Sequence, residues 1–200
     1  MDILEKLFGN ATKVRIMKLF LFHSDKFFDI EEIKKRTQQS IVKVRKEINV
    51  LEKIGFLKKK KIPLSKVSGK KTKEKSFKWQ LDLDFPYVNH LQGMLIHTNP
   101  FANKEILKKF KNLGELKLLI ISGIFIQNWE SRVDLLIVGE KLKKPSINSA
   151  IKSLEADMGC ELRYTVLENE DFNYRMNMYD KLIRDVLDFP HKKVLNKLDI

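Results

Sequence analysis

Residues 29–61 read DIEEIKKRTQQSIVKVRKEINVLEKIGFLKKKK, and they contain the clearest structural pattern in the first part of the chain. It opens with Asp29 followed by Glu32 three positions on, which is a capping-box arrangement. A capping box satisfies the free N–H groups of a first helical turn from both sides. We therefore expect a short helix to begin here and to continue to about Arg36, before the polar turn 37–39.

A second helix is expected directly after this turn, from a cap at Ser40 to Ile54, with Gly55 ending it. Its apolar residues recur at helical spacing and define an inner face: Val44, Ile48 and Leu51. Its opposite face carries Lys43, Arg45, Lys46 and Asn49. Two short helices, a three-residue turn and a basic outer face form the helix-turn-helix order, in which the second helix enters the DNA major groove. The residues expected to contact DNA there are Gln39, Ser40, Lys43, Arg45 and Lys46.

A hairpin is expected after Gly55, because short strands near residues 56–61 and 76–81 flank a lysine-dense stretch. Residues 56–80 contain ten lysines and one acid, Glu74. Lysine ammonium groups are point charges without a fork geometry, so they suit phosphates better than bases. The lysines expected to contact phosphates are Lys58, Lys59, Lys60, Lys70, Lys71 and Lys73.

The segments before and after the two helices complete a pattern that resembles a known family. Asn10 is expected to cap a helix with Val14, Met17, Phe20 and Leu21 at helical spacing. Together with Leu7-Phe8-Gly9 and Gly55-Phe56-Leu57, residues 1–82 resemble the winged helix-turn-helix domains of ArsR-type bacterial transcriptional regulators. The resemblance implies double-stranded DNA as partner, a homodimer, and transcription regulation. A winged helix used for protein contact is the alternative.

The charge distribution agrees with that expectation. Residues 1–80 hold 22 basic and 9 acidic side chains, whereas residues 81–200 hold 17 of each. The entire net charge of +13 therefore lies in the first part of the chain. Such asymmetry is expected when one domain faces a polyanion and another does not. The alternative is a lysine-rich surface that is simply solvated.

The rest of the chain predicts a helical connector and an α/β domain, so that the fold class is α+β. Residues 83–112 are expected to form two helices that serve in dimer contact or in packing between domains. Residues 113–200 predict buried strands at 116–126 and 133–138, a helix at 146–158, a strand at 161–167, two short helices, and a closing strand or arm.

Residues 113–188 resemble the minimal nucleotidyltransferase fold through LLIISG (118–123) and SRVDLLIVG (131–139). The family reads Gly-Ser after its first strand, Ser-Asp-X-Asp at its second, and supplies a further carboxylate later. Here Arg132 replaces the first carboxylate, Gly-Ser is absent, and the third strand has no interior acid. Because the reaction needs Mg²⁺ ions held by these carboxylates, the resemblance implies a catalytically inactive domain without a metal or cofactor.

Asp134 matches the remaining carboxylate of the motif. We expect it to lie at a solvent-facing strand end, paired with Arg132 or Lys117. The alternative is a degenerate nucleotide or anion site made by Ser131, Arg132 and Asp134, with Arg163.

Other chemistries find no support in the sequence. One cysteine and four scattered histidines give no disulfide and no metal-ligand spacing. No apolar run approaches the roughly 20 residues of a membrane helix, so we expect a cytoplasmic protein. The expected function is a DNA-binding regulator whose second domain senses a small-molecule or protein effector or mediates self-association. The alternatives are an active nucleotidyltransferase tethered to nucleic acid and an antitoxin-like module that binds a partner protein.

Overall fold

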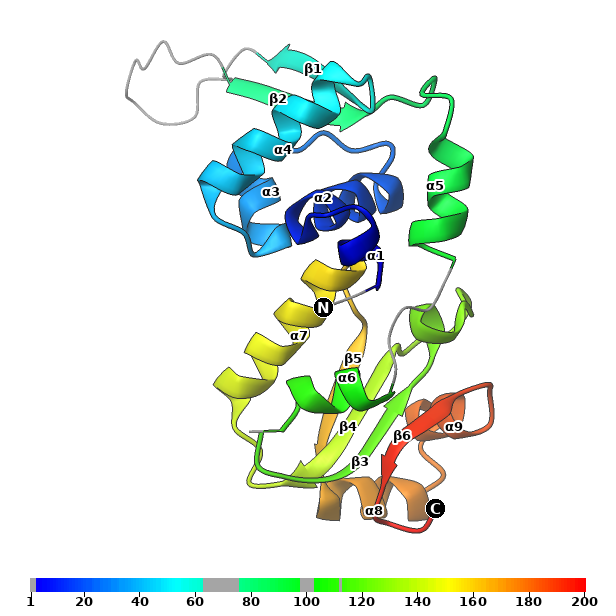
Figure 1. Cartoon of the computed structure of the whole chain (residues 1–200). Coiled ribbons are helices and arrows are strands. Elements are labelled where there is room, and N and C mark those ends of the chain that lie inside the picture. Colours follow the sequence, from blue (N-terminus) through cyan, green and yellow to red (C-terminus); the bar gives the residue numbers. More distant parts are fainter. Residues whose placement is uncertain (1–2, 63–75, 98–102, 112) are drawn as a thin grey trace. The chain divides into compact units, whose positions relative to one another are not determined.

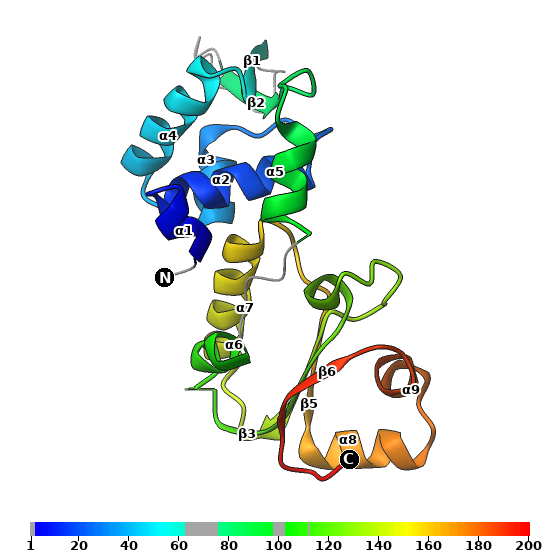
Figure 2. The ribbon, with the colours of Figure 1, turned by 45° about the vertical axis from the view of Figure 1, so that its right-hand side comes forward.

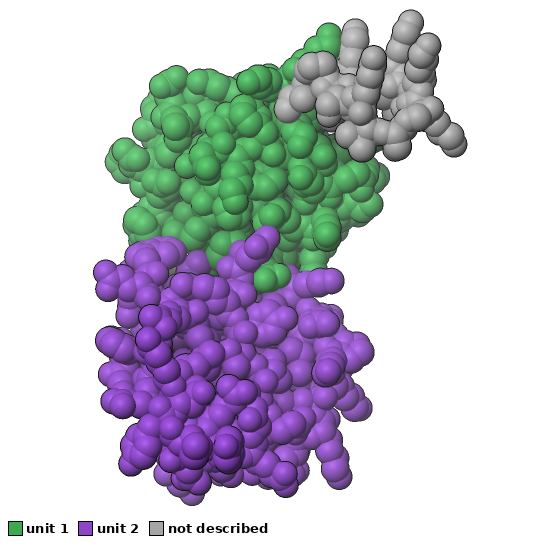
Figure 3. Space-filling model, turned by 180° about the vertical axis from the view of Figure 1, so that it is seen from behind, with its two compact units in different colours: residues 1–98, 155–160 green, residues 99–154, 161–200 purple. Residues whose placement is uncertain are grey.

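The computed structural model describes residues 3–62, 76–97, 103–111 and 113–200, and it is a mixed α+β protein. The chain divides into two compact units, coloured separately in Figure 3. Unit 1 comprises residues 1–98 and 155–160, and unit 2 comprises residues 99–154 and 161–200. No helix in the described ranges has the length and apolar character needed to cross a membrane.

Unit 1 is built from helices followed by an antiparallel hairpin and one more helix (Figure 1). Its elements are α1 (Ile3–Leu7), α2 (Ala11–Phe22), α3 (Ile30–Thr37), α4 (Ile41–Lys53), β1 (Leu57–Ile62), β2 (Ser76–Leu81) and α5 (Val88–Leu95). All of these elements except α1, which was not predicted from the sequence, lie within a few residues of a predicted element. Apolar side chains from α2, α3, α4, the hairpin and α5 share a core, in which Phe20, Ile33, Val44 and Phe56 are fully buried.

Local hydrogen bonds explain where these helices begin. Asn10 accepts hydrogen bonds from the backbone N–H groups of Thr12 and Lys13, which confirms it as the cap of α2. The capping box of Asp29 and Glu32 is present in both directions at the start of α3. Ser40 occupies the cap position of α4, but its side chain makes no capping hydrogen bond, so this part of the expectation is wrong.

The hairpin is joined to the helical part of unit 1 by an isolated β-bridge as well as by side-chain contacts. β1 pairs with β2 from Leu57 opposite Leu81 to Ile62 opposite Ser76. Phe28, in the loop before α3, exchanges two backbone hydrogen bonds of 2.9 Å with Trp79 on β2. Trp79 therefore lies between Lys59 of β1 and Phe28, and its bridge to Phe28 fixes β2 against the helical core.

Unit 2 is a mixed sheet with helices on both faces (Figures 1 and 2). Its elements are α6 (Asn103–Lys109), β3 (Glu115–Ile121), the 3₁₀ helix η1 (Gly123–Ile126), β4 (Leu135–Glu140), α7 (Lys144–Met158, with its last residues in unit 1), β5 (Tyr164–Glu168), α8 (Asn169–Asn177), α9 (Lys181–Leu187) and β6 (Lys192–Asn196). The strand order is β5-β4-β3-β6, with β4 and β5 parallel and the other pairs antiparallel.

Strand periodicity divides the buried side chains of this sheet between its two faces. Leu118, Ile120, Leu136 and Val138 pack with Phe172 of α8 and with Ile183 and Val186 of α9. The alternate residues Leu119, Ile121, Leu135 and Ile137 are also fully buried and point to the opposite face. Both faces are covered, which explains why these strands read as continuous apolar runs rather than alternating ones.

The predicted strand at 116–126 is wrong in its second half. β3 ends at Ile121, and Gly123–Ile126 forms η1. Gly123 has φ +55°, and the backbone N–H of Ile124 donates to the Asp134 carboxylate at 3.0 Å. Because a buried carboxylate captures this N–H, the apolar run turns away from the sheet although its composition suits a strand.

Candidate nucleic-acid interface

The helix α4 has one buried face and one charged, exposed face. Val44, Ile48 and Leu51 are at most 1 % exposed and fix the orientation of the helix in the core of unit 1. The predicted contact residues Lys43, Arg45 and Lys46 are all exposed on its other sides. None of the three forms an ion pair with a residue that the structure describes. Their charges are therefore available to a partner.

The two polar residues predicted beside these cations lie at the start of α4 and differ in accessibility. Gln39 is half-buried, and its side-chain oxygen accepts a hydrogen bond of 3.0 Å from the Thr12 hydroxyl. Ser40 is exposed at the cap position. The structure thus gives Gln39 an internal structural contact, whereas Ser40 keeps its hydroxyl at the surface.

The beginning of α2 holds the turn and α4 in place. The Asn10 side-chain amide donates to the Glu47 carboxylate at 2.6 Å, and Lys13 lies 3.7 Å from the same group. Arg15 donates to the backbone carbonyl of Thr37 at 3.1 Å. Glu47 is 4 % exposed, so these polar contacts lie inside the unit and not on its surface. They position α4 through α2, and none of them involves its basic outer face.

The hairpin is attached to the far end of α4 through Glu52. Trp79 donates its indole N–H to Glu52 Oε2 at 3.0 Å. Lys59 Nζ lies 3.9 Å from Glu52 Oε1 and 4.4 Å from the centre of the Phe77 ring. Lys59 therefore connects β1 with β2 and with α4. Its side chain is held by these contacts, unlike that of a lysine in a flexible loop.

The other predicted phosphate-binding lysines have different surroundings. Lys58 Nζ lies 2.7 Å from Asp82 and 3.1 Å from Asp84. These hydrogen bonds raise the pKa of Lys58 above its ordinary value, and the bond from Lys58 lowers the pKa of Asp82. Lys60 lies 5.1 Å above the ring of Phe27. Lys70, Lys71 and Lys73 lie outside the described residues.

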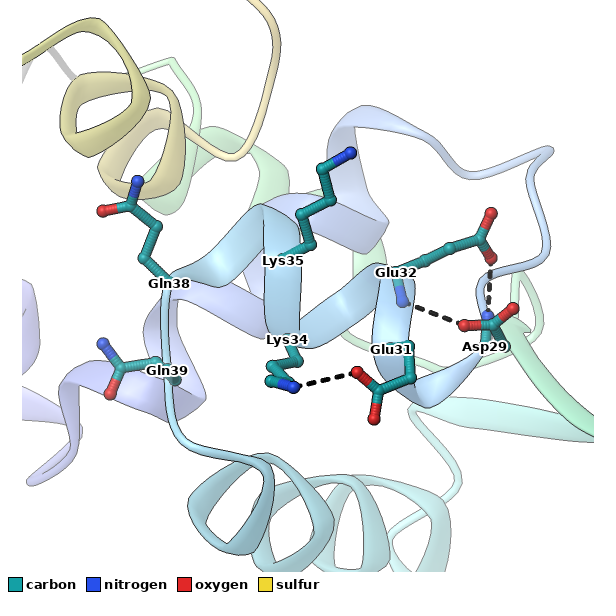
Figure 4. Close-up of a pocket in the computed structure, with 7 residues that line it drawn as sticks. All are labelled: Asp29, Glu31, Glu32, Lys34, Lys35, Gln38 and Gln39. Atoms are coloured by element: carbon teal, nitrogen blue, oxygen red, sulfur yellow. Dashed lines mark hydrogen bonds and ion pairs between the residues drawn. The ribbon is translucent and has the colours of Figure 1, made fainter. Parts of the chain in front are cut away.

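A hollow of about 640 Å³ lies along α3 and the turn before α4 (Figure 4). The residues that line it are all of polar or charged types: Asp29, Glu31, Glu32, Lys34, Lys35, Gln38 and Gln39. Figure 4 shows Asp29 and Glu32 turned toward each other at one end of α3, with the two glutamines at the other end. Lys34 pairs with Glu31 at 2.9 Å. None of its seven lining residues is an aliphatic or aromatic residue of the kind that usually lines ligand pockets.

The structure adds two residues to the outer face that the sequence prediction left out. Val42 is 74 % exposed, and Lys53 is exposed in the last turn of α4. Residues 42, 46, 49 and 53 follow one another at spacings of four, three and four, which places them on one line along a helix. This spacing is visible in the sequence and marks the middle of the outer face.

In unit 2, Asp134 is not at the surface and its partner is neither Arg132 nor Lys117. It is 2 % exposed, and Arg163 donates to it through Nε at 3.0 Å, Nη2 at 2.9 Å and its backbone N–H at 2.9 Å. With the N–H of Ile124, the carboxylate accepts four hydrogen bonds, two on each oxygen. A carboxylate offers about four lone-pair sites, so this one is saturated.

Ser131 and Arg132 of the predicted degenerate nucleotide site form a hydrogen bond and an ion pair with groups other than Asp134. The Ser131 hydroxyl donates to the carbonyl of Val133 at 2.8 Å. Arg132 lies 3.2 Å from Asp185 of α9, and Lys117 pairs with Glu115 at 2.7 Å. Ser131, Arg132 and Asp134 are neighbours in sequence, but their hydrogen bonds do not converge on one point.

Within the described ranges, no group of three or more His, Cys, Asp and Glu side chains is arranged to hold a metal ion. The single cysteine, Cys160, is buried. Comparison of the chain with protein-family models, curated proteins and solved structures gave no match in any of the three.

Proposed function

We propose that unit 1 binds duplex DNA as a winged helix, with α4 in the major groove and the β1–β2 hairpin on the adjacent backbone, and that the chain regulates transcription. The observation that carries this proposal is the outer face of α4. Lys43, Arg45 and Lys46 are exposed there and make no ion pair among the described residues, while the opposite face is completely buried. A helix of this shape and charge fits the major groove, which admits an α-helix.

The attachment of the hairpin supports the same arrangement. Through Trp79 and Lys59, Glu52 ties the hairpin to the last turns of α4. A fixed angle between the helix and the hairpin lets both contact one duplex, because phosphate contacts set the register in which base contacts are made. Lys61, exposed on β1 and without an ion-pair partner in the described part of the chain, adds charge on the hairpin.

The experiment measures the affinity of the full chain for a labelled duplex by fluorescence anisotropy at several salt concentrations. The test variant replaces Lys43, Arg45 and Lys46 with alanine. The matched control replaces Lys104, Lys108 and Lys152 of unit 2, which are equally exposed cations, so that both variants lose three charges. We expect the test variant alone to lose most of the affinity and to reduce the slope of log affinity against log salt by up to about 2.7, at about 0.9 per phosphate contact.

Equal losses in the two variants would show that affinity follows the total charge and not this face, and would overturn the proposal. Unchanged affinity in the test variant would overturn it as well. A selection from random duplexes then tests for a regulator, since a homodimer would enrich two half-sites about 34 Å apart.

For unit 2 we propose a nucleotidyltransferase-like domain that has lost catalysis and that serves as a sensor or in self-association. The support is the saturated Asp134 carboxylate, which has no oxygen lone pair left for Mg²⁺. Arg163 would place a positive charge where the reaction requires cations. The test is Mg²⁺-dependent incorporation of labelled nucleotide by the full chain, and incorporation above that of a protein-free control would overturn the proposal.

A further inference from the structure

One side chain on the outer face of α4 is out of keeping with its neighbours. Val42 is 74 % exposed, although Lys43, Arg45 and Lys46 surround it on the same helix. It lies in the first turn, on the line of residues that continues with Lys46 and Asn49. It is thus an apolar group in the middle of a basic face, near the end of the helix that enters the groove first in this kind of fold.

The folding of unit 1 gives no reason for a valine at this position. A β-branched side chain loses rotamer freedom in a helix and is a weaker helix former than alanine, lysine or glutamate. With three quarters of its surface in water, Val42 also gains little from burial, and it is absent from the core of unit 1. By contrast Val44, two positions on, is fully buried.

We infer that Val42 contacts the C5-methyl group of a thymine and so makes α4 select a T·A pair at one position of each half-site; this inference rests on the DNA binding proposed above. In the major groove, thymine is the only base that presents a methyl group, and cytosine has a hydrogen at the same place. The isopropyl group of Val42 carries no donor or acceptor, so it recognises this feature by apolar contact alone. The neighbouring cations Lys43, Arg45 and Lys46 supply the positive charge that attracts this helix to the DNA.

The contact has a defined energetic scale. Burying one methyl-sized apolar group corresponds to about a fourfold change in affinity. Replacement of thymine by uracil removes only that methyl group and leaves all hydrogen-bonding edges of the pair intact. Uracil substitution is therefore a selective probe of the contact.

The experiment first selects a tight-binding duplex from a random pool with the full chain, and then replaces each thymine of that duplex with uracil, one at a time. Affinities are measured for the natural chain, for Val42→Ala and for Val50→Ala. Val50 is the matched control, because it is an exposed valine two turns further along the same helix, and its substitution removes the same atoms. Alanine is the better helix former at both positions, so both variants are expected to fold.

We expect one thymine in each half-site at which uracil weakens binding by the natural chain and by Val50→Ala about fourfold, but leaves binding by Val42→Ala unchanged. A selected site at which no uracil substitution discriminates Val42→Ala from the natural chain overturns the inference while DNA binding stands. Binding without any sequence enrichment overturns it in the same way. Failure to bind any duplex overturns the proposed function itself.

Discussion

Arg163 holds Asp134 from two directions, because its backbone N–H and both ends of its guanidinium fork donate to the same buried carboxylate. Asp134 precedes β4 and Arg163 precedes β5, so this contact joins the two parallel strands where they begin. The carboxylate also accepts the N–H of Ile124 and so positions the turn after β3. One side chain thereby connects the ends of neighbouring strands.

Removing the side chain of Asp134 and removing that of Arg163 should lower the free energy of unfolding by different amounts. Asp134→Ala leaves two backbone N–H groups without their acceptor, and we expect it to lower the free energy of unfolding by about 3–5 kcal/mol. Arg163→Ala leaves the carboxylate with two backbone donors, and the Arg163 side chain is 51 % exposed, so we expect a loss of only about 1–2 kcal/mol. Urea unfolding monitored by circular dichroism measures both; a larger loss in Arg163→Ala would contradict this account.

Gly123→Ala should be strongly destabilising. A Cβ atom at this position would lie 2.0 Å from Asp134 Oδ1, and the residue has φ +55°. The left-handed backbone alone costs an alanine about 1–2 kcal/mol, and the clash with a carboxylate held by four hydrogen bonds adds to it, so we expect a loss of at least about 3 kcal/mol. Gly93→Ala is the control, since a Cβ there meets no atom within 4 Å inside α5. It should raise stability by about 0.5–1 kcal/mol.

Glu52 should couple the hairpin to DNA binding. Glu52→Ala removes the acceptor of the Trp79 indole N–H, and we expect a loss of about 1–2 kcal/mol in stability together with weaker DNA affinity. Glu52→Gln keeps an acceptor for the indole but loses the charge facing Lys59, so it should restore most of the stability. Paired unfolding and anisotropy measurements test this, and an unchanged affinity in Glu52→Ala would show that the hairpin does not contribute to binding.

The Lys58–Asp82 contact should appear in the acid dependence of stability. The pKa of Asp82 is lowered in the folded chain by its hydrogen bond from Lys58. Its contribution is therefore present above the unfolded value of about 3.9 and is lost as the pH falls through the folded pKa. The difference in unfolding free energy between the natural chain and Asp82→Asn should be constant near neutral pH and shrink below about pH 4. In a Lys58→Met background that pH dependence should become smaller but persist, because the backbone N–H of Asp84 still donates to Asp82.

Neighbouring lysines on β1 should differ in their effect on DNA affinity. The charge of Lys58 is balanced by Asp82 and Asp84, whereas Lys61 is exposed without an ion pair in the described residues. We expect Lys61→Ala to reduce the salt slope by about 1, and Lys58→Ala to leave it nearly unchanged. Equal slopes for the two variants would mean that the internal ion pairs of Lys58 open when DNA binds.

Features of this protein that depend on neighbours a few positions apart could be predicted from the amino-acid sequence alone. The caps at Asn10 and Asp29 and the end of α4 before Gly55 follow from hydrogen bonds and backbone preferences within one turn. The two faces of α4 follow from its helical period, which also marks Val42 and Lys53. These interactions form wherever the local sequence is present, so a pattern of a few residues is sufficient to predict them.

Contacts between groups far apart in the chain could not be predicted in this way and are known only from the folded structure. Asp134 and Arg163 are 29 positions apart, and Asp134 also accepts the N–H of Ile124 in η1, where the predicted strand does not continue beyond Ile121. Lys58 is likewise separated from Asp82 and Asp84 by the hairpin and by a turn, and the fold places its Nζ 2.7 Å and 3.1 Å from these carboxylates. From composition alone, such charges are expected to be unpaired. In the folded chain, a charged side chain pairs with whichever opposite charge the backbone places close to it. The number of residues between two charges in the sequence does not give this distance in space.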